Sequence, residues 1–144
     1  MLSENLQIYK DTYDLVRQMY RYMNNVPKHV RYGEYGHAVS MVLDALDLIY
    51  VANSDMDGRV GTLTRYLQLI GGIRSRVRLF GELQYLSVRQ ATILCTMMEK
   101  CSRQATSWRN SSQARTTEPR QGGRADIPRD EMELSPSCGQ RPVK

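Results

Sequence analysis

Apolar residues recur at steps of three and four up to about residue 109, which is the period of helices that bury one side. The first such pattern covers about residues 5–25, and its apolar stripe consists of Tyr9, Tyr13, Val16, Tyr20 and Met23. The second covers about residues 34–54, and its stripe consists of Val39, Val42, Leu43, Leu46, Ile49 and Tyr50. Each pattern predicts a helix that turns its stripe toward a common core.

Two further helical patterns follow along the chain. The third covers about residues 60–85, and its stripe consists of Leu63, Tyr66, Leu67, Ile70, Ile73, Val77, Phe80 and Leu83. The fourth covers about residues 88–109, and its stripe consists of Ala91, Leu94, Met98, Cys101, Ala105 and Trp108. Ser87 and Gln90 have the spacing of a capping box at its start. Gly71 and Gly72 interrupt the third stripe, which favours close approach of another helix or backbone over a simple weak point.

These four segments predict an all-α fold, an antiparallel up-down-up-down four-helix bundle. The third and fourth segments are joined by a very short link and are therefore expected to be antiparallel neighbours. Gly33 and Gly36 favour an irregular link between the first and second segments. Asp55 and Asp57 resemble part of a calcium loop whose later ligands are missing, so we expect a helix-terminating turn there.

The composition of the chain changes near residue 110. From Ser111 onward the sequence is rich in Pro, Gly, Ser and Arg and shows no apolar periodicity. Such a segment buries too little apolar surface to offset the entropy of ordering. The predicted organisation is therefore a bundle over residues 1–110 and a disordered tail over residues 111–144.

The net charge of +5, from twenty basic and fifteen acidic residues, favours an anionic partner such as nucleic acid. Arginines four residues apart share one face of a helix, and such faces suit contact with phosphates without base readout. The candidate nucleic-acid-binding residues are Arg17, Arg21, Arg74, Arg78, Lys28, Arg31 and Arg103. Ordinary solvated helix faces are the alternative interpretation of the same charges.

The sequence contains no catalytic or metal-binding motif, so we expect no catalytic residue, no metal and no cofactor. Its two histidines, His29 and His37, lack the Glu-x-x-His pairs of a ferritin-like site, and no glycine loop for phosphate is present. One catalytic alternative stays open. Arg31 and His37 have the approximate spacing used by helical RNases of the HEPN class, with the His as general acid or base and the Arg stabilising a phosphorane-like state.

The cysteines indicate a reducing compartment. Cys95, Cys101 and Cys138 form neither a metal-binding spacing nor an even disulfide set, and the first two are predicted to be small core residues. The N-terminal residues lack the basic and apolar regions of a signal peptide, and no stretch approaches the length of a membrane-spanning helix. We therefore expect a cytoplasmic protein without a membrane partner.

Several runs of residues are characteristic of one family. They are IYKDTYDLV in the first helical segment, NNVPKHVRYGEYG in the link after it, LDLIYVANSD at the end of the second, VRLFGELQYLSVRQATIL across the third and fourth, and MMEKCSRQATSW in the fourth. Together they resemble the bacterial four-helix bundle family over about residues 6–109. The tail lies outside the resemblance.

This family includes two groups with different expected roles. One is the accessory variability determinant (Avd) proteins of diversity-generating retroelements, and the other is encoded by intervening sequences in 23S rRNA genes. Resemblance to Avd implies a non-enzymatic homopentamer that binds the retroelement's reverse transcriptase and its template RNA or cDNA and supports mutagenic retrohoming. Resemblance to the rRNA-associated group implies a structural or scaffolding role. The sequence leaves both open.

Overall fold

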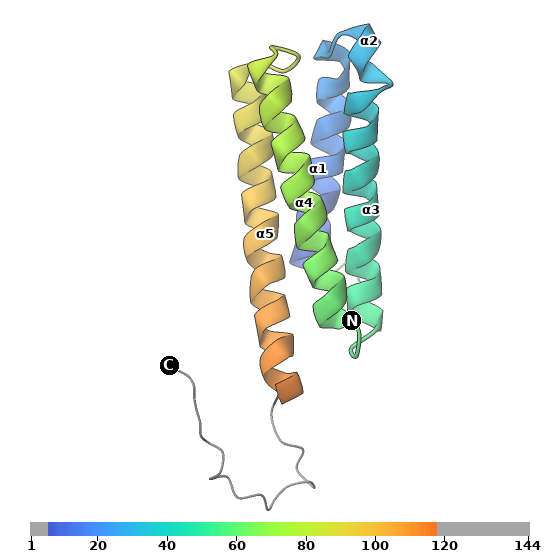
Figure 1. Ribbon diagram of the computed structural model, residues 1–144, viewed down its shortest axis with the longest axis vertical. Coiled ribbons are helices and arrows are strands. Elements are labelled where there is room, and N and C mark those ends of the chain that lie inside the picture. The colour runs from blue at the N-terminus through green and yellow to red at the C-terminus, as the bar shows by residue number, and fades with distance from the viewer. Residues whose placement is uncertain (1–5, 118–144) are drawn as a thin grey trace, which may run out of the picture. The chain divides into compact units, whose positions relative to one another are not determined.

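The chain forms an antiparallel up-down-up-down bundle of four long helices, as predicted (Figure 1). The computed structural model describes residues 6–117, with no strand among them. The elements are α1 (Gln7–Tyr22), the short 3₁₀ turn η2 (Met23–Asn25), α2 (Lys28–Arg31), α3 (Glu34–Ser54), α4 (Arg59–Glu82) and α5 (Val88–Thr117). The four long helices of the predicted bundle are α1, α3, α4 and α5.

Contacts between side chains give the order of the helices around the core. α3 packs between α1 and α4. Arg74 of α4 pairs with Glu99 of α5, and Asp11 of α1 pairs with Lys100 of α5, so α5 lies beside both α4 and α1. α1 and α4 therefore lie on opposite corners of the bundle. They meet only across the core, where the hydroxyl oxygens of Thr12 and Tyr66 lie 2.7 Å apart.

The helix boundaries agree with the sequence except at two places. The link after α1, which was expected to be irregular, contains the one-turn helix α2 behind Pro27. The fourth helix does not end near residue 109 but continues to Thr117, because Ser112 occupies the same buried side of α5 as Ala105, two turns earlier. The first residues of the predicted disordered tail are thus helical. The remainder of that tail lies outside the described residues.

The buried side of α1 differs from the predicted stripe. The core contains Ile8, Leu15, Val16 and Met19, whereas Tyr13 and Tyr20 are 49% and 50% exposed. Two apolar stripes run along α1 about one residue apart, and the periodicity of the first pattern followed the tyrosines. The buried side of α1 also carries Asp11 and Thr12, whose polar groups find partners in α5 and α4.

The other three stripes were predicted more accurately. In α3, Val39, Val42 and Ile49 are buried as expected, but Leu46 is only partly buried, and Leu43 and Tyr50 are 37% and 62% exposed. Tyr35, which was not in the predicted stripe, is fully buried. The stripe predicted for α4 is buried except that Leu67 is only partly buried and Leu83 is half exposed, and Arg59 is buried in addition. In α5, Leu94, Met98, Cys101 and Ala105 are fully buried, and Ala91 and Trp108 pack against the core from its edge.

Specific hydrogen bonds fix the helix ends. The predicted capping box is confirmed, since Gln90 N donates to Ser87 Oγ and Ser87 N donates to Gln90 Oε1, both at 3.0 Å. The expected turn after α3 is also present, with Gly58 N donating to Asp55 Oδ1 at 3.2 Å. Arg59 was not singled out from the sequence. Its buried guanidinium donates to the carbonyl of Ala52 at 2.7 Å and lies over the ring of Trp108.

Glycines permit close contacts between helices, but the closest contact is not at the Gly71–Gly72 pair that the sequence suggested. The methyl carbon of Met41 lies 3.3 Å from where a side chain at Gly72 would begin, whereas Gly71 faces open space. Two helices approach most closely at Gly81, where an added Cβ would lie 3.0 Å from the Cβ of Ala91. Gly81 therefore sets the separation of α4 and α5 near their link.

Among the described residues, one segment is long and apolar enough to cross a membrane by length and composition, contrary to the expectation from the sequence. It is Lys28–Ser54, in which a window of 18 residues has a mean hydropathy of 1.2. Its buried apolar side chains supply α3's share of the bundle core.

Candidate nucleic-acid interface

The candidate basic residues lie on two faces that point in opposite directions. Arg17 and Arg21 are exposed on α1, while Arg74 and Arg78 are exposed on α4. Because α1 and α4 meet across the core at Thr12 and Tyr66, their exposed sides face away from each other. We call these the α1 face and the α4–α5 face.

The α4–α5 face borders a groove of about 510 Å³. Arg74 lies on its rim and donates to Glu99 of α5 at 3.2 Å, with both side chains about half exposed. Arg78 also lines the groove, one turn further along α4. Arg103 lies one turn beyond Glu99 on α5 and lines a neighbouring hollow together with that glutamate. The structure thus brings Arg74, Arg78 and Arg103 to one side of the bundle.

Cys95 lies in the α4–α5 groove rather than in the core. Burial raises the pKa of its thiol above the ordinary 9.0, and the nearby guanidinium groups of Arg74 and Arg78 oppose that effect only in part. The thiol therefore stays protonated at neutral pH. Cys101 is fully buried, as predicted, while Cys138 lies outside the described residues.

The α1 face combines arginines with exposed tyrosines. Arg17 pairs with Asp14 at 3.6 Å, and both side chains are 56% exposed. Arg21 donates to Gln18 at 3.3 Å on the same exposed surface. An exposed ion pair of this kind contributes little because water competes for both charges. Arg17 and Arg21 are therefore free to exchange these contacts for a phosphate.

The two candidates from the first link differ in role. Lys28 is exposed at the start of α2. Arg31 is only partly exposed, and its Nη2 donates to the carbonyl oxygens of Asn24 and Val26 at 3.4 and 3.2 Å. Its guanidinium therefore holds the turn between α1 and α2. This is a structural role.

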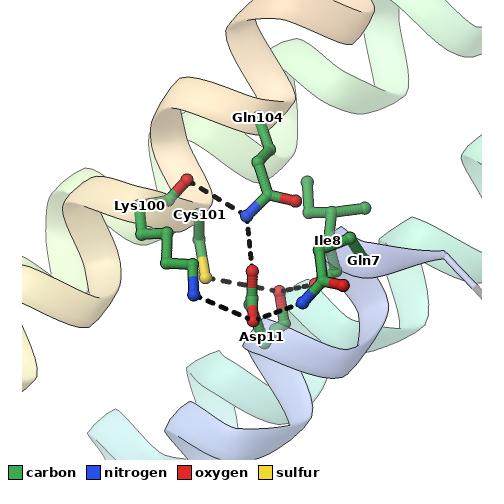
Figure 2. Close-up of polar contacts among 7 residues, drawn as sticks. Gln7, Ile8, Asp11, Lys100, Cys101 and Gln104 are labelled. Carbon is green, nitrogen blue, oxygen red and sulfur yellow. Dashed lines mark hydrogen bonds and ion pairs between the residues drawn. The ribbon is translucent and has the colours of Figure 1, made fainter.

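Lys100 of α5 is another basic residue with a structural role. Figure 2 shows the carboxylate of Asp11, on α1, between the side chains of Lys100 and Gln104 on α5. Asp11 also accepts a hydrogen bond of 3.0 Å from Gln7. Asp11 is buried, so its charge needs these partners. The network joins α1 to α5, while the side chain of Lys100 itself remains 58% exposed.

A second polar cluster, formed by Thr12, Tyr66 and Cys101, lies in the core and is closed to solvent. Thr12 of α1 contacts the hydroxyl of Tyr66 and the thiol of Cys101, 3.7 Å away, and donates to the carbonyl of Ile8. Burial raises the pKa of Tyr66 far above 10.0, with a further contribution from Cys101. The group is fully buried and neutral at physiological pH, and it links α1, α4 and α5.

Sequence reasoning missed the exposed tyrosines as part of the α1 face. Tyr13 and Tyr20 were assigned to the core because their spacing fits a helical stripe. A second apolar stripe lies beside them in the sequence and contains Ile8, Leu15 and Met19. Where two such stripes compete, the sequence leaves the choice open, and packing against the neighbouring helices decides it.

Comparison with protein-family models, with curated proteins and with solved structures finds no match to this chain.

Proposed function

We propose that this protein is a non-enzymatic accessory subunit of a diversity-generating retroelement. It binds the element's reverse transcriptase together with template RNA or cDNA in the cytoplasm, and so supports mutagenic retrohoming. Two things support this proposal, namely the resemblance of residues 6–109 to the Avd group and the distribution of arginines over the bundle. The fold itself is common to many functions and carries no weight here.

The observation that carries the proposal is the pair of exposed arginine faces. Arg17 and Arg21 on one side, and Arg74 and Arg78 on the other, are held on rigid helices and make only exposed, solvent-screened contacts. Such groups contact the phosphate backbone without reading bases, as a subunit that serves any template must do. Their position on opposite sides lets one bundle contact two strands, or a strand and a neighbouring subunit.

Assembly strengthens the same argument. A closed ring of five copies would multiply the charge of +5 per chain into a strongly basic particle. Exposed tyrosines are suitable anchors between copies, since tyrosine is enriched at protein interfaces. On α3, Tyr50 is exposed together with Leu43, and this helix contains no Lys or Arg.

The test is co-purification with the reverse transcriptase encoded beside this protein, followed by sizing with light scattering. We expect one species that contains the polymerase, RNA and several copies of this chain. A particle without polymerase or RNA would overturn the proposal and would favour the scaffolding role of the rRNA-associated group.

A variant with Arg17, Arg21, Arg74 and Arg78 all changed to Ala tests the arginine faces directly. We expect it to lose RNA affinity and to lower the slope of log affinity against log salt by about one unit per arginine. The matched control changes the same four residues to Lys, which keeps the charges and should keep the slope. RNA binding by the Ala variant as tight as that of the parent at low salt would show that these arginines do not bind phosphate.

A further inference from the structure

The exposed side of α1 carries aromatic and cationic side chains in turn. Tyr13, Arg17, Tyr20 and Arg21 follow one another along about two turns of the helix, and both tyrosines are about half exposed. Seven residues separate the tyrosines, which places them about 10 Å apart along the helix axis. A single exposed apolar side chain is ordinary, whereas several gathered on one surface are typical of a contact site.

Tyr13 is held in a defined position by its neighbour. Its ring stacks on that of Tyr9, with centroids 6.4 Å apart and planes inclined by 22°. Tyr9 in turn packs against the core. A hollow of about 450 Å³ lies at these rings and is lined by Tyr9, Lys10, Tyr13 and Asp14. A ring fixed in this way loses little conformational freedom when a flat ligand stacks on it.

Cationic groups flank the rings at helical spacing. Arg17 lies one turn after Tyr13 and one turn before Tyr20, and Lys10 lies one turn before Tyr13. Asp14 is the single acidic residue among them, and its 3.6 Å contact with Arg17 is exposed to water. The surface therefore presents flat aromatic faces between positive charges.

We propose that this surface binds single-stranded nucleic acid, with bases stacked on Tyr13 and Tyr20 and phosphates contacted by Lys10, Arg17 and Arg21. Stacking is open to every base because each has an aromatic face, so binding needs no particular sequence. In a duplex these faces are covered by neighbouring base pairs and cannot reach the tyrosines. The inference rests on the nucleic-acid binding proposed above and specifies the strand state of the ligand.

The experiment measures fluorescence anisotropy of labelled strands of equal length: single-stranded RNA, single-stranded DNA, a duplex, and a single strand with abasic positions. The parent should bind the intact single strands more tightly than the duplex or the abasic strand. The variant Y13A/Y20A should lose about tenfold or more in affinity per stacked base for the intact strands, with an unchanged salt slope, because its charges are intact. Comparison of the RNA strand with the DNA strand shows whether the 2′-hydroxyl of the ribose contributes to affinity.

Three variants make the result specific. Y13F/Y20F keeps the rings and should keep the affinity, and it also controls for folding. M56A removes an exposed large apolar side chain from the turn between α3 and α4, which contains no Lys or Arg, and should leave binding unchanged. R17A/R21A should lower the salt slope by about two units, in contrast to the tyrosine variant.

The outcomes separate this inference from the proposed function. If the parent binds single strands and Y13A/Y20A binds them equally well, the stacking surface is wrong while nucleic-acid binding stands. If the parent binds intact and abasic strands with equal affinity, bases do not stack on the tyrosines, and the stacking surface is again wrong. If Y13A/Y20A instead reduces the particle mass without a change in affinity, the tyrosines lie between copies and the inference fails. No binding of any strand by the parent at low salt overturns both.

Discussion

The hydroxyl of Tyr66 is the point at which three helices of the bundle meet. It lies 2.7 Å from Thr12 of α1, and Thr12 also contacts the thiol of Cys101 of α5. A buried hydroxyl without a partner is costly, so this group favours one arrangement of the helices over others. It also links folding to pH, because burial raises the pKa of both Tyr66 and Cys101.

The first prediction concerns alkaline pH. The pKa of Tyr66 is raised above 10.0 in the folded protein, so the folded state holds this proton more tightly than the unfolded chain does. Its contribution to stability is present below about pH 10 and is lost as the pH rises above that value. Y66F removes the ionisable group, so its free energy of unfolding should fall less steeply between about pH 9 and pH 11 than that of the parent.

Urea unfolding followed by the fluorescence of Trp108 measures this difference. At neutral pH, Y66F should be less stable by about 1 kcal/mol, because it loses the hydrogen bond to Thr12. Thr12 itself still donates to the carbonyl of Ile8, so no donor is left without a partner. An equal loss of stability by parent and variant at high pH would show that the Tyr66 proton does not determine alkaline unfolding.

Within α4, three of the four glycines look alike in the sequence but have different surroundings. Gly71 faces open space, Gly72 lies under the flexible side chain of Met41, and Gly81 contacts the Cβ of Ala91 in α5. The cost of glycine in a helix is the same at each position, but only Gly81 is required by its neighbour. Ala91 gives way only if its helix moves, since its Cβ is fixed to the backbone.

The second prediction compares two substitutions in this helix. G71A should stabilise the protein by about 0.4–1 kcal/mol, because it reduces the entropy of the unfolded chain without a clash. G81A gains the same entropy but forces α4 and α5 apart, and overpacking of this kind costs about 1–3 kcal/mol. Thermal unfolding by circular dichroism should therefore show a higher Tm for G71A and a lower Tm for G81A. A higher Tm for both would mean that the two helices separate there at no cost.

As a whole molecule, the bundle presents chemically different sides. The exposed parts of α1 and α4 are rich in arginine, whereas α3 between them exposes Asp44, Asp47, Leu43 and Tyr50. Among the described residues these two aspartates pair with no arginine of their own chain. An acidic and apolar side beside basic ones is suited to head-to-tail contact between copies, which closes into a ring.

The third prediction follows from this segregation of charge. If copies associate through α3, light scattering at micromolar concentration should give a mass of about five times the 16.6 kDa of one chain. D44K/D47K reverses the charge of that side and should lower the mass, whereas K28E, in the short helix α2, should not. Sedimentation of the parent as a monomer would exclude assembly at this concentration.

The fold was largely predictable because its determinants are local. The period of apolar residues along each segment defined the four helices, the Ser87–Gln90 spacing defined the start of α5, and the short link made α4 and α5 neighbours. The end of α5 was harder to predict. The Ser and Gln residues after Asn110 are polar by composition, and only packing of Ser112 against the bundle shows that the helix continues.

The candidate site was predictable in its residue types but not in its arrangement. From the sequence alone one obtains the basic pairs, since residues four apart on a helix share a face. Only the tertiary structure decided that α1 and α4 lie on opposite corners of the bundle, that Arg31 and Lys100 hold contacts within the chain, and that Tyr13 and Tyr20 are exposed. The physical reason is that periodicity gives each helix its candidate faces, while burial is a competition among faces that only the neighbouring helices resolve.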